Sequence, residues 1–159
     1  MGDSVRGALI GCGFFAENHL NAWRDLGANI VAVCDIDLGK AESAASRHKI
    51  ARAYSDANEM LRTEKPDFVD IVTTVPSHRM LVELAAKNGV GAICQKPFAT
   101  NLADADAMIA ACEDGEGGST FESSANFIRR GKKKGPQIDE TFTVREIASR
   151  AFYQLPGHA

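Results

Sequence analysis

A short glycine loop is the part of the sequence best suited to bind a charged ligand. Residues 8–16 are Ala-Leu-Ile-Gly-Cys-Gly-Phe-Phe-Ala, so a G-x-G-x-x-A pattern follows an apolar run and opens a segment with helical spacing. Gly11 permits a tight turn, Gly13 lets the backbone approach a pyrophosphate, and Ala16 allows a helix to pack closely on a strand. The N–H groups at the start of that helix can then bind phosphates, so the pattern predicts a phosphate-binding loop.

A carboxylate follows the next apolar run, where a nucleotide ribose would bind. The run 30–34 ends at Asp35, which can accept hydrogen bonds from the hydroxyl groups of an adenosine ribose. The same charge repels the 2′-phosphate of NADP, and the following residues, Ile36 and Asp37, supply no arginine to neutralise it. Loop and carboxylate together predict a dinucleotide site for NAD, with NADP less favoured.

Two further polar segments follow predicted strands. Residues 73–78, Thr-Thr-Val-Pro-Ser-His, follow the apolar run 68–72, and residues 95–97, Gln-Lys-Pro, follow the run 91–94. Ligands of open α/β sheets bind beyond the carboxyl ends of the strands. We therefore expect both segments to lie beside the glycine loop.

The elements that must position these residues alternate along the chain. Apolar runs with strand character lie at 5–10, 30–34, 53–54, 68–72 and 91–94, and helical periodicity at 15–26, 38–48, 58–62, 79–88 and 100–112. Such an alternation requires crossover connections, which give a mostly parallel sheet with helices on both faces. The sequence predicts an α/β fold over residues 1–113: a Rossmann-like, doubly wound sheet in three α/β/α layers.

The character of the sequence changes after this part. Residues 113–124 are rich in acidic residues, glycine and serine, and residues 129–136 form a basic cluster. We expect residues 114–159 to be an irregular, flexible tail, because they offer too little apolar surface for a core of their own. The basic cluster has no interleaved aromatic residues, so we interpret it as solvated rather than as a nucleic-acid site.

Composition narrows the choice of partners. The chain has 159 residues, 45% of them hydrophobic, and a net charge of −3, which points to no polyanionic partner. No apolar run is long enough to span a bilayer, and no leader pattern opens the chain. We expect a cytoplasmic protein without nucleic-acid or membrane partners.

The cysteines and the remaining histidines have ordinary structural interpretations. The cysteines lack C-x-x-C or zinc-finger spacing, so we expect reduced structural thiols and no metal site. We interpret His19 as a packing or surface residue, and His48 and His158 as solvated.

Taken in order, these motifs resemble the N-terminal domain of the Gfo/Idh/MocA oxidoreductases, a family named for glucose–fructose oxidoreductase and inositol 2-dehydrogenase. That family joins the glycine loop to a T-P-x-x-x-H-like segment and then to an E-K-P motif, and the resemblance covers residues 6–112. It implies a cofactor site with a phosphate loop, a ribose acid and two strand-end segments. These are Gly11, Gly13, Phe14, Phe15 and Ala16; Asp35; Thr73, Thr74, Pro76 and His78; and Gln95 with Lys96.

The resemblance also implies a reaction. Hydride would pass from the CH–OH group of a sugar, inositol or related polyol to the nicotinamide, with Lys96 as the catalytic residue. As the hydride leaves, the hydroxyl must lose its proton, and a nearby amine or ammonium can stabilise or relay that charge. Gln95 stands where the family has glutamate, and without this anionic neighbour we expect Lys96 to be more readily deprotonated.

Other possibilities stay open on the sequence. The family's second α/β domain has no counterpart here, so we expect a truncated or frame-shifted product whose uncovered face favours homo-oligomers. Whether such a chain turns over substrate is open, and a non-catalytic nucleotide-binding remnant or sensor is the main alternative. A methyltransferase using S-adenosylmethionine is disfavoured, because Leu9 and Ile10 precede Gly11 where such enzymes carry an acidic residue.

Overall fold

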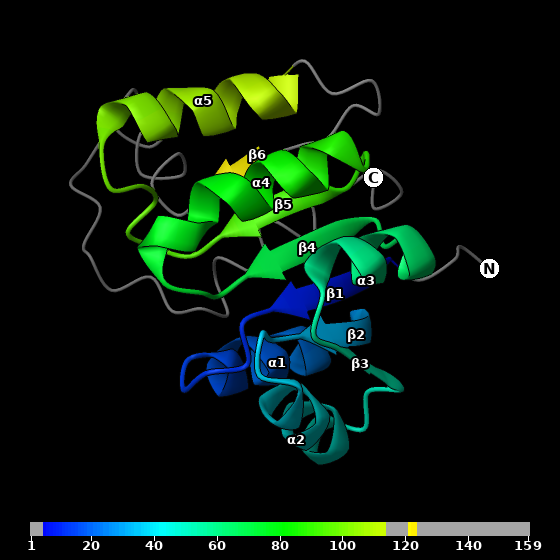
Figure 1. Ribbon diagram of the computed structural model, residues 1–159. Helices are drawn as coiled ribbons and strands as arrows, with labels where there is room; N and C mark the ends of the chain where they lie inside the picture. The colour runs from blue at the N-terminus through cyan, green and yellow to red at the C-terminus, as the bar shows by residue number, and fades with distance from the viewer. Residues whose placement is uncertain (1–4, 114–120, 124–159) are drawn as a thin grey trace, which may run out of the picture.

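Strands and helices alternate along the chain as the sequence predicts (Figure 1). The structure is a computed structural model that describes residues 5–113 and 121–123. Its elements are β1 (Arg6–Ile10), α1 (Ala16–Asp25), β2 (Asn29–Cys34), α2 (Leu38–His48), β3 (Arg52–Tyr54), α3 (Ala57–Glu64), β4 (Phe68–Ile71), the 3₁₀ turn η1 (Val75–Ser77), α4 (His78–Lys87), β5 (Gly91–Cys94), α5 (Leu102–Glu113) and β6 (Phe121–Ser123).

The strands form one parallel sheet in the order β3-β2-β1-β4-β5-β6. The chain moves outward from β1 through β2 to β3, and then crosses back to place β4 on the other side of β1. The loops after β1 and β4 therefore run in opposite directions, which opens the crevice where doubly wound sheets bind ligands. The predicted Rossmann-like fold class is confirmed.

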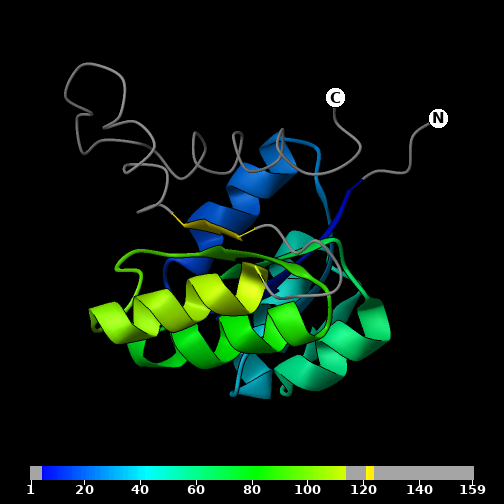
Figure 2. The ribbon, with the colours of Figure 1, turned by 90° about the horizontal axis from the view of Figure 1, so that it is seen from above.

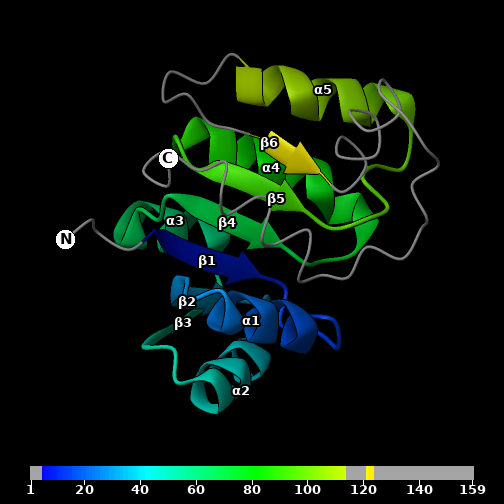
Figure 3. The same cartoon turned by 180° about the vertical axis from the view of Figure 1, so that it is seen from behind.

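Helices cover both faces of this sheet, as Figures 2 and 3 show from above and from behind. Along β1 the side chains alternate: Ala8 and Ile10 belong to the core beneath α3, α4 and α5, whereas Leu9 belongs to the core beneath α1 and α2. All three side chains are buried. A central strand that is apolar on both faces is typical of a parallel sheet enclosed between two helical layers.

Strand β6 lies within the segment that we expected to be irregular. It pairs in parallel with β5, so that Ala92 faces Phe121 and Cys94 faces Ser123 in the ladder. Three residues flanked by a glycine- and serine-rich stretch give no detectable periodicity, which explains why the sequence pattern missed this strand. The basic cluster 129–136 and His158 lie outside the described residues, and the division at residue 113 stays a prediction.

None of the described helices is long and apolar enough to cross a membrane.

Candidate functional site

The glycine loop leaves β1 and turns sharply into α1. Gly11 has a φ of 100°, and a Cβ there would lie 2.5 Å from the carbonyl oxygen of Val72, so only glycine fits. Gly13 differs, because a Cβ at this position would meet nothing within 4 Å. Ala16, the first residue of α1, is buried. The loop thus packs tightly against the end of β4 on one side and is open on the other, at the N-terminus of α1.

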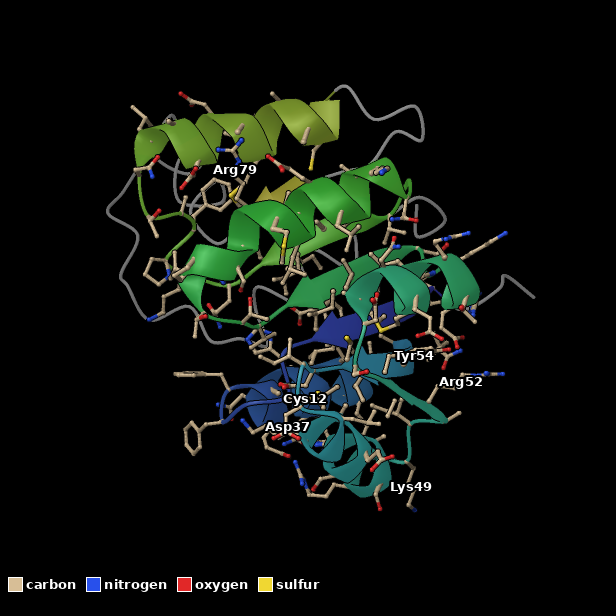
Figure 4. All side chains as sticks on the ribbon, in the orientation of Figure 1. Cys12, Asp37, Lys49, Arg52, Tyr54 and Arg79 are labelled. Atoms are coloured by element: carbon tan, nitrogen blue, oxygen red, sulfur yellow. The ribbon has the colours of Figure 1, made fainter. Side chains whose placement is uncertain are left out.

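The carboxylate of Asp35 is held by backbone groups at the end of β2. The Cys12 N–H, within the glycine loop, donates to Asp35 Oδ2 at 2.8 Å, and the Asp37 N–H donates to Oδ1 at 2.9 Å. Figure 4 shows Cys12 and Asp37 close to each other at the end of the molecule where β1 and β2 end. Each carboxylate oxygen has two lone pairs, so both retain capacity to accept a hydroxyl from a ribose.

Three exposed apolar side chains stand on the same two loops. Phe14 is 87% exposed, Phe15 is 54% exposed, and Ile36, next to Asp35, is 97% exposed. The two phenylalanine rings contact each other edge to face at 5.9 Å between centroids. Large apolar groups on a loop surface offer flat contact area to an aromatic base.

The segment after β4 is tied to the segment after β5 by His78. Its imidazole is fully buried, with Nδ1 3.1 Å from the Phe98 carbonyl oxygen and Nε2 3.0 Å from the Thr73 carbonyl oxygen. The neighbouring residues Thr74 and Pro76 are exposed. His78 therefore acts on this site through the backbone that it holds, whereas Thr74 and Pro76 present their side chains to solvent.

Lys96 follows β5 at the same edge of the sheet and is exposed. The loop that carries it is anchored through Gln95, whose backbone N–H donates to the Ile71 carbonyl oxygen at 3.0 Å. The side-chain Oε1 of Gln95 accepts from the Lys96 N–H at 2.7 Å. The peptide bond between Lys96 and Pro97 is cis.

A buried acid that the sequence analysis did not single out lies beneath this loop. Asp70, in the middle of β4, is 1% exposed, and its Oδ2 accepts from Trp23 Nε1 at 2.7 Å and from His19 Nδ1 at 2.8 Å. Burial lowers the pKa of His19, but attraction to the Asp70 carboxylate and their hydrogen bond outweigh it, so the net pKa is raised. A lone carboxylate within an apolar run was the available signal, because a buried charge requires partners.

Two histidines outside these motifs each contact a carboxylate, His19 that of Asp70 and His48 that of Glu17. His19 is a packed residue, as one of the two expected possibilities had it. His48 is not solvated: its side chain is 9% exposed and its Nε2 lies 2.8 Å from Glu17 Oε2. The expectation was wrong because His48 contacts the Glu17 carboxylate of a neighbouring helix, 31 residues away. A contact between residues so far apart cannot be predicted from the local sequence.

The thiols behave as structural groups. Cys12, Cys34 and Cys94 are buried, and burial, with a smaller contribution from nearby carboxylates, raises the pKa of each to about 12. Such groups stay protonated and inert at neutral pH, as expected. Among the described residues, no group of three or more His, Cys, Asp or Glu side chains is placed to hold a metal ion.

Comparison with known proteins places this geometry in a family. The model of the Gfo/Idh/MocA oxidoreductase family, described as an NAD-binding Rossmann fold, matches residues 5–120. A D-apiose dehydrogenase from Paraburkholderia graminis is 64% identical over 109 residues, which are 68% of this chain and 29% of that protein. An inositol 2-dehydrogenase from Acidothermus cellulolyticus is 36% identical over 104 residues, 63% of this chain and 30% of that protein.

Solved structures agree with the sequence matches. An oxidoreductase from Agrobacterium radiobacter, solved in complex with NAD+, L-tartaric acid and magnesium, superposes with a TM-score of 0.72 at 46% identity and covers 80% of this chain and 38% of its own. The chain thus spans about a third of the length of the relatives that it matches. It belongs to the Gfo/Idh/MocA oxidoreductase family, and the matched part is that family's NAD-binding Rossmann domain.

Proposed function

We propose that the chain holds NAD(H) along the carboxyl ends of β1, β2, β4 and β5 for hydride exchange with the CH–OH group of a sugar, inositol or related polyol. The observation that carries the proposal is the Asp35 carboxylate, held by the Cys12 and Asp37 N–H groups directly beside the open side of the glycine loop. A ribose acid and a phosphate loop in contact with each other are what a dinucleotide requires.

The residues present fit the cofactor from one end to the other. Asp35 would accept from the adenosine ribose hydroxyls, and the pyrophosphate would lie in the open space at Gly13, against the first N–H groups of α1. Phe14, Phe15 and Ile36 offer apolar surface to the base. Ala16 would contribute by close packing of α1, as its burial supports.

The charge around Asp35 favours NAD over NADP. Asp35 and Asp37 are both acidic and lie within two residues of each other at the ribose position. A 2′-phosphate would meet this negative charge with no basic residue in the segment 34–38 to offset it.

The nicotinamide end would lie near the segments after β4 and β5. Thr73, Thr74 and Pro76 would line its path, held in place by His78, and Gln95 with Lys96 would form the opposite wall. When bound, the nicotinamide supplies the hydride acceptor. Lys96 Nζ would take up or stabilise the proton that leaves the substrate hydroxyl, which is a role that an exposed amine at this edge of the sheet can fill.

The relatives support the substrate class. The two named above are a D-apiose dehydrogenase and an inositol 2-dehydrogenase, and both names denote oxidation of a polyhydroxylated compound. The family assignment also argues against the methyltransferase alternative, because the matched family consists of oxidoreductases. Because the chain spans only about a third of these relatives, its own turnover is a separate question from cofactor binding.

The test separates binding from turnover. NADH fluorescence is titrated with the chain, with Asp35→Asn, and with Asp25→Asn as a control of equal charge change on the exposed end of α1. We expect Asp35→Asn to weaken NADH binding by about 10- to 100-fold, since hydrogen bonds to a charged group contribute about 1.5–3 kcal/mol, and Asp25→Asn to leave it unchanged. NADH formation with D-apiose and inositol then distinguishes an active enzyme from a binding module. Equal affinities of the three proteins would contradict the proposed site.

A further inference from the structure

A continuous chain of hydrogen bonds joins the buried side of β4 to the backbone of Lys96. Asp70 Oδ2 contacts His19 Nδ1 at 2.8 Å, and the other ring nitrogen, His19 Nε2, lies 2.8 Å from Gln95 Nε2. Gln95 Oε1 in turn accepts from the Lys96 N–H at 2.7 Å. The histidine is 7% exposed, so the chain crosses the protein interior from α1 and β4 to the loop after β5.

The directions of these bonds follow from one group. The Lys96 N–H can only donate, so the oxygen of the Gln95 amide must face it and the amide NH₂ must face His19. His19 Nε2 is then an acceptor, which places the ring proton on Nδ1, pointing at the Asp70 carboxylate. Every donor in the chain meets an acceptor when His19 is neutral.

We propose that His19 is a positioning residue for the loop that carries Lys96, acting through the Gln95 amide. The imidazole fixes the orientation of the amide, and the amide fixes the backbone of Lys96. Only the importance of Lys96 for hydride exchange rests on the proposed function, because the hydrogen-bond chain lies entirely within the protein.

A protonated His19 cannot maintain the same arrangement. With protons on both ring nitrogens, Nε2–H would face the amide NH₂ of Gln95, so the amide must turn and release the Lys96 N–H. Asp70, on β4, is the charged group that acts on His19 among the described residues, while Gln95 and Trp23 are neutral. Since Asp70 raises the pKa of His19, acidification to mildly acidic pH reaches this second state.

Two conservative variants separate positioning from packing. His19→Asn keeps a donor near the position of Nδ1, toward Asp70, but is too short to reach Gln95. His19→Gln keeps an acceptor near the position of Nε2, toward Gln95, but loses the donor to Asp70. Each variant therefore removes one of the two bonds of His19 and retains the other.

The experiment measures amide hydrogen exchange of the ¹⁵N-labelled chain without cofactor, at a pH above the end of the His19 titration, which is first followed by NMR on the same sample. The readout is the exchange rate of the Lys96 backbone N–H divided by that of the Gln95 backbone N–H. The Gln95 backbone N–H donates to the Ile71 carbonyl oxygen and so reports only the pairing at the end of β5. We expect His19→Asn to raise this ratio about tenfold, the loss of one ordinary hydrogen bond, and His19→Gln to leave it within about twofold of wild type. Equal ratios in the two variants, or the reverse order, would overturn the proposal.

The tautomer provides a second measurement that needs no variant. Long-range ¹H–¹⁵N correlation spectra of wild type, recorded at a pH above the end of the His19 titration, should show the proton of the neutral imidazole on Nδ1. A proton on Nε2 would overturn the proposal even if both variants were unstable. Neither measurement involves NAD, so failure here is distinct from failure of the cofactor site, which the NADH titration tests.

Discussion

Replacement by alanine should have different effects at the two glycines of the phosphate loop, on stability at one and on NADH binding at the other. At Gly11 the new Cβ would lie 2.5 Å from the Val72 carbonyl oxygen and 2.7 Å from the Val72 carbonyl carbon, both of them backbone atoms. At Gly13 the new Cβ would meet nothing within 4 Å, and its φ is not positive. Gly11→Ala should therefore lower the stability of the fold, whereas Gly13→Ala should weaken ligand binding.

The expected magnitudes follow from these contacts. Gly11→Ala forces a non-glycine residue to a φ of 100°, at a cost of about 1–2 kcal/mol, and the shift of the Val72 backbone adds about 1–3 kcal/mol. Together these lower the free energy of unfolding by about 3 kcal/mol, a large part of the about 5–15 kcal/mol of an ordinary domain. Gly13→Ala should change it by less than about 1 kcal/mol, in the stabilising direction, because alanine restricts the unfolded chain.

NADH binding should be weakened mainly by Gly13→Ala. The space at Gly13 is where the pyrophosphate would approach the backbone, so a methyl group there should weaken NADH binding on the order of 100-fold, equivalent to about 2.7 kcal/mol. Urea unfolding and an NADH fluorescence titration of both variants measure the two effects on the same samples. A Gly13→Ala protein that binds NADH as wild type does, or a Gly11→Ala protein as stable as wild type, would refute this reasoning.

Three further outcomes are expected. Cys12 should resist iodoacetamide in the folded chain and react on unfolding, since a thiol with a pKa of about 12 is thiolate in about one part in 10⁴ at about pH 8; rapid labelling of Cys12 before unfolding would contradict its burial. The raised pKa of His19 stabilises the fold below its ordinary value of 6.5, and this contribution is lost as pH rises through the raised value. The difference in unfolding free energy between wild type and His19→Gln, measured in urea at about pH 5.5 and about pH 8.5, should therefore be larger at the lower pH, and an equal or opposite difference would count against the His19–Asp70 interaction. Gln95→Glu places a carboxylate against His19 Nε2, so the pKa of His19 should rise further in an NMR titration. An unchanged titration of His19 would show that the side chain of residue 95 does not contact it in solution.

The sequence predicted the elements well because they follow local rules. The strand, glycine loop and helix over residues 6–25 show their periodicity and their turn residues in order. Strand β6 was missed because its three residues lie in a glycine- and serine-rich stretch without periodicity. The parallel direction of the strands followed from the crossover connections that an alternation of strands and helices requires, which needs no knowledge of individual contacts. These features depend on spacing, which the sequence displays directly.

The side-chain contacts were less accessible, since they join residues far apart in the chain. Asp70 appeared only as one letter of an apolar run, and nothing local indicated that His19 and Trp23 would both donate to it. His78 entered through its motif, but its buried position between the Thr73 and Phe98 carbonyl groups depends on how two loops pack together. The bond of His78 to Phe98 spans 20 residues and that of Gln95 to His19 spans 76, and such contacts become visible only when the fold brings these segments together.

The way in which Asp35 is held suggests a route to altered cofactor preference. Its carboxylate occupies two backbone N–H groups, those of Cys12 and Asp37, and both donors remain when the Asp35 side chain is changed. Replacement of Asp35 by serine would therefore do more than delete a repulsive charge, because it would release two fixed donors at the place where a 2′-phosphate would lie. An engineer who seeks an NADP-dependent version of this domain would thus start from an anion-binding pair already present in the main chain, and would need to add only the positive charge.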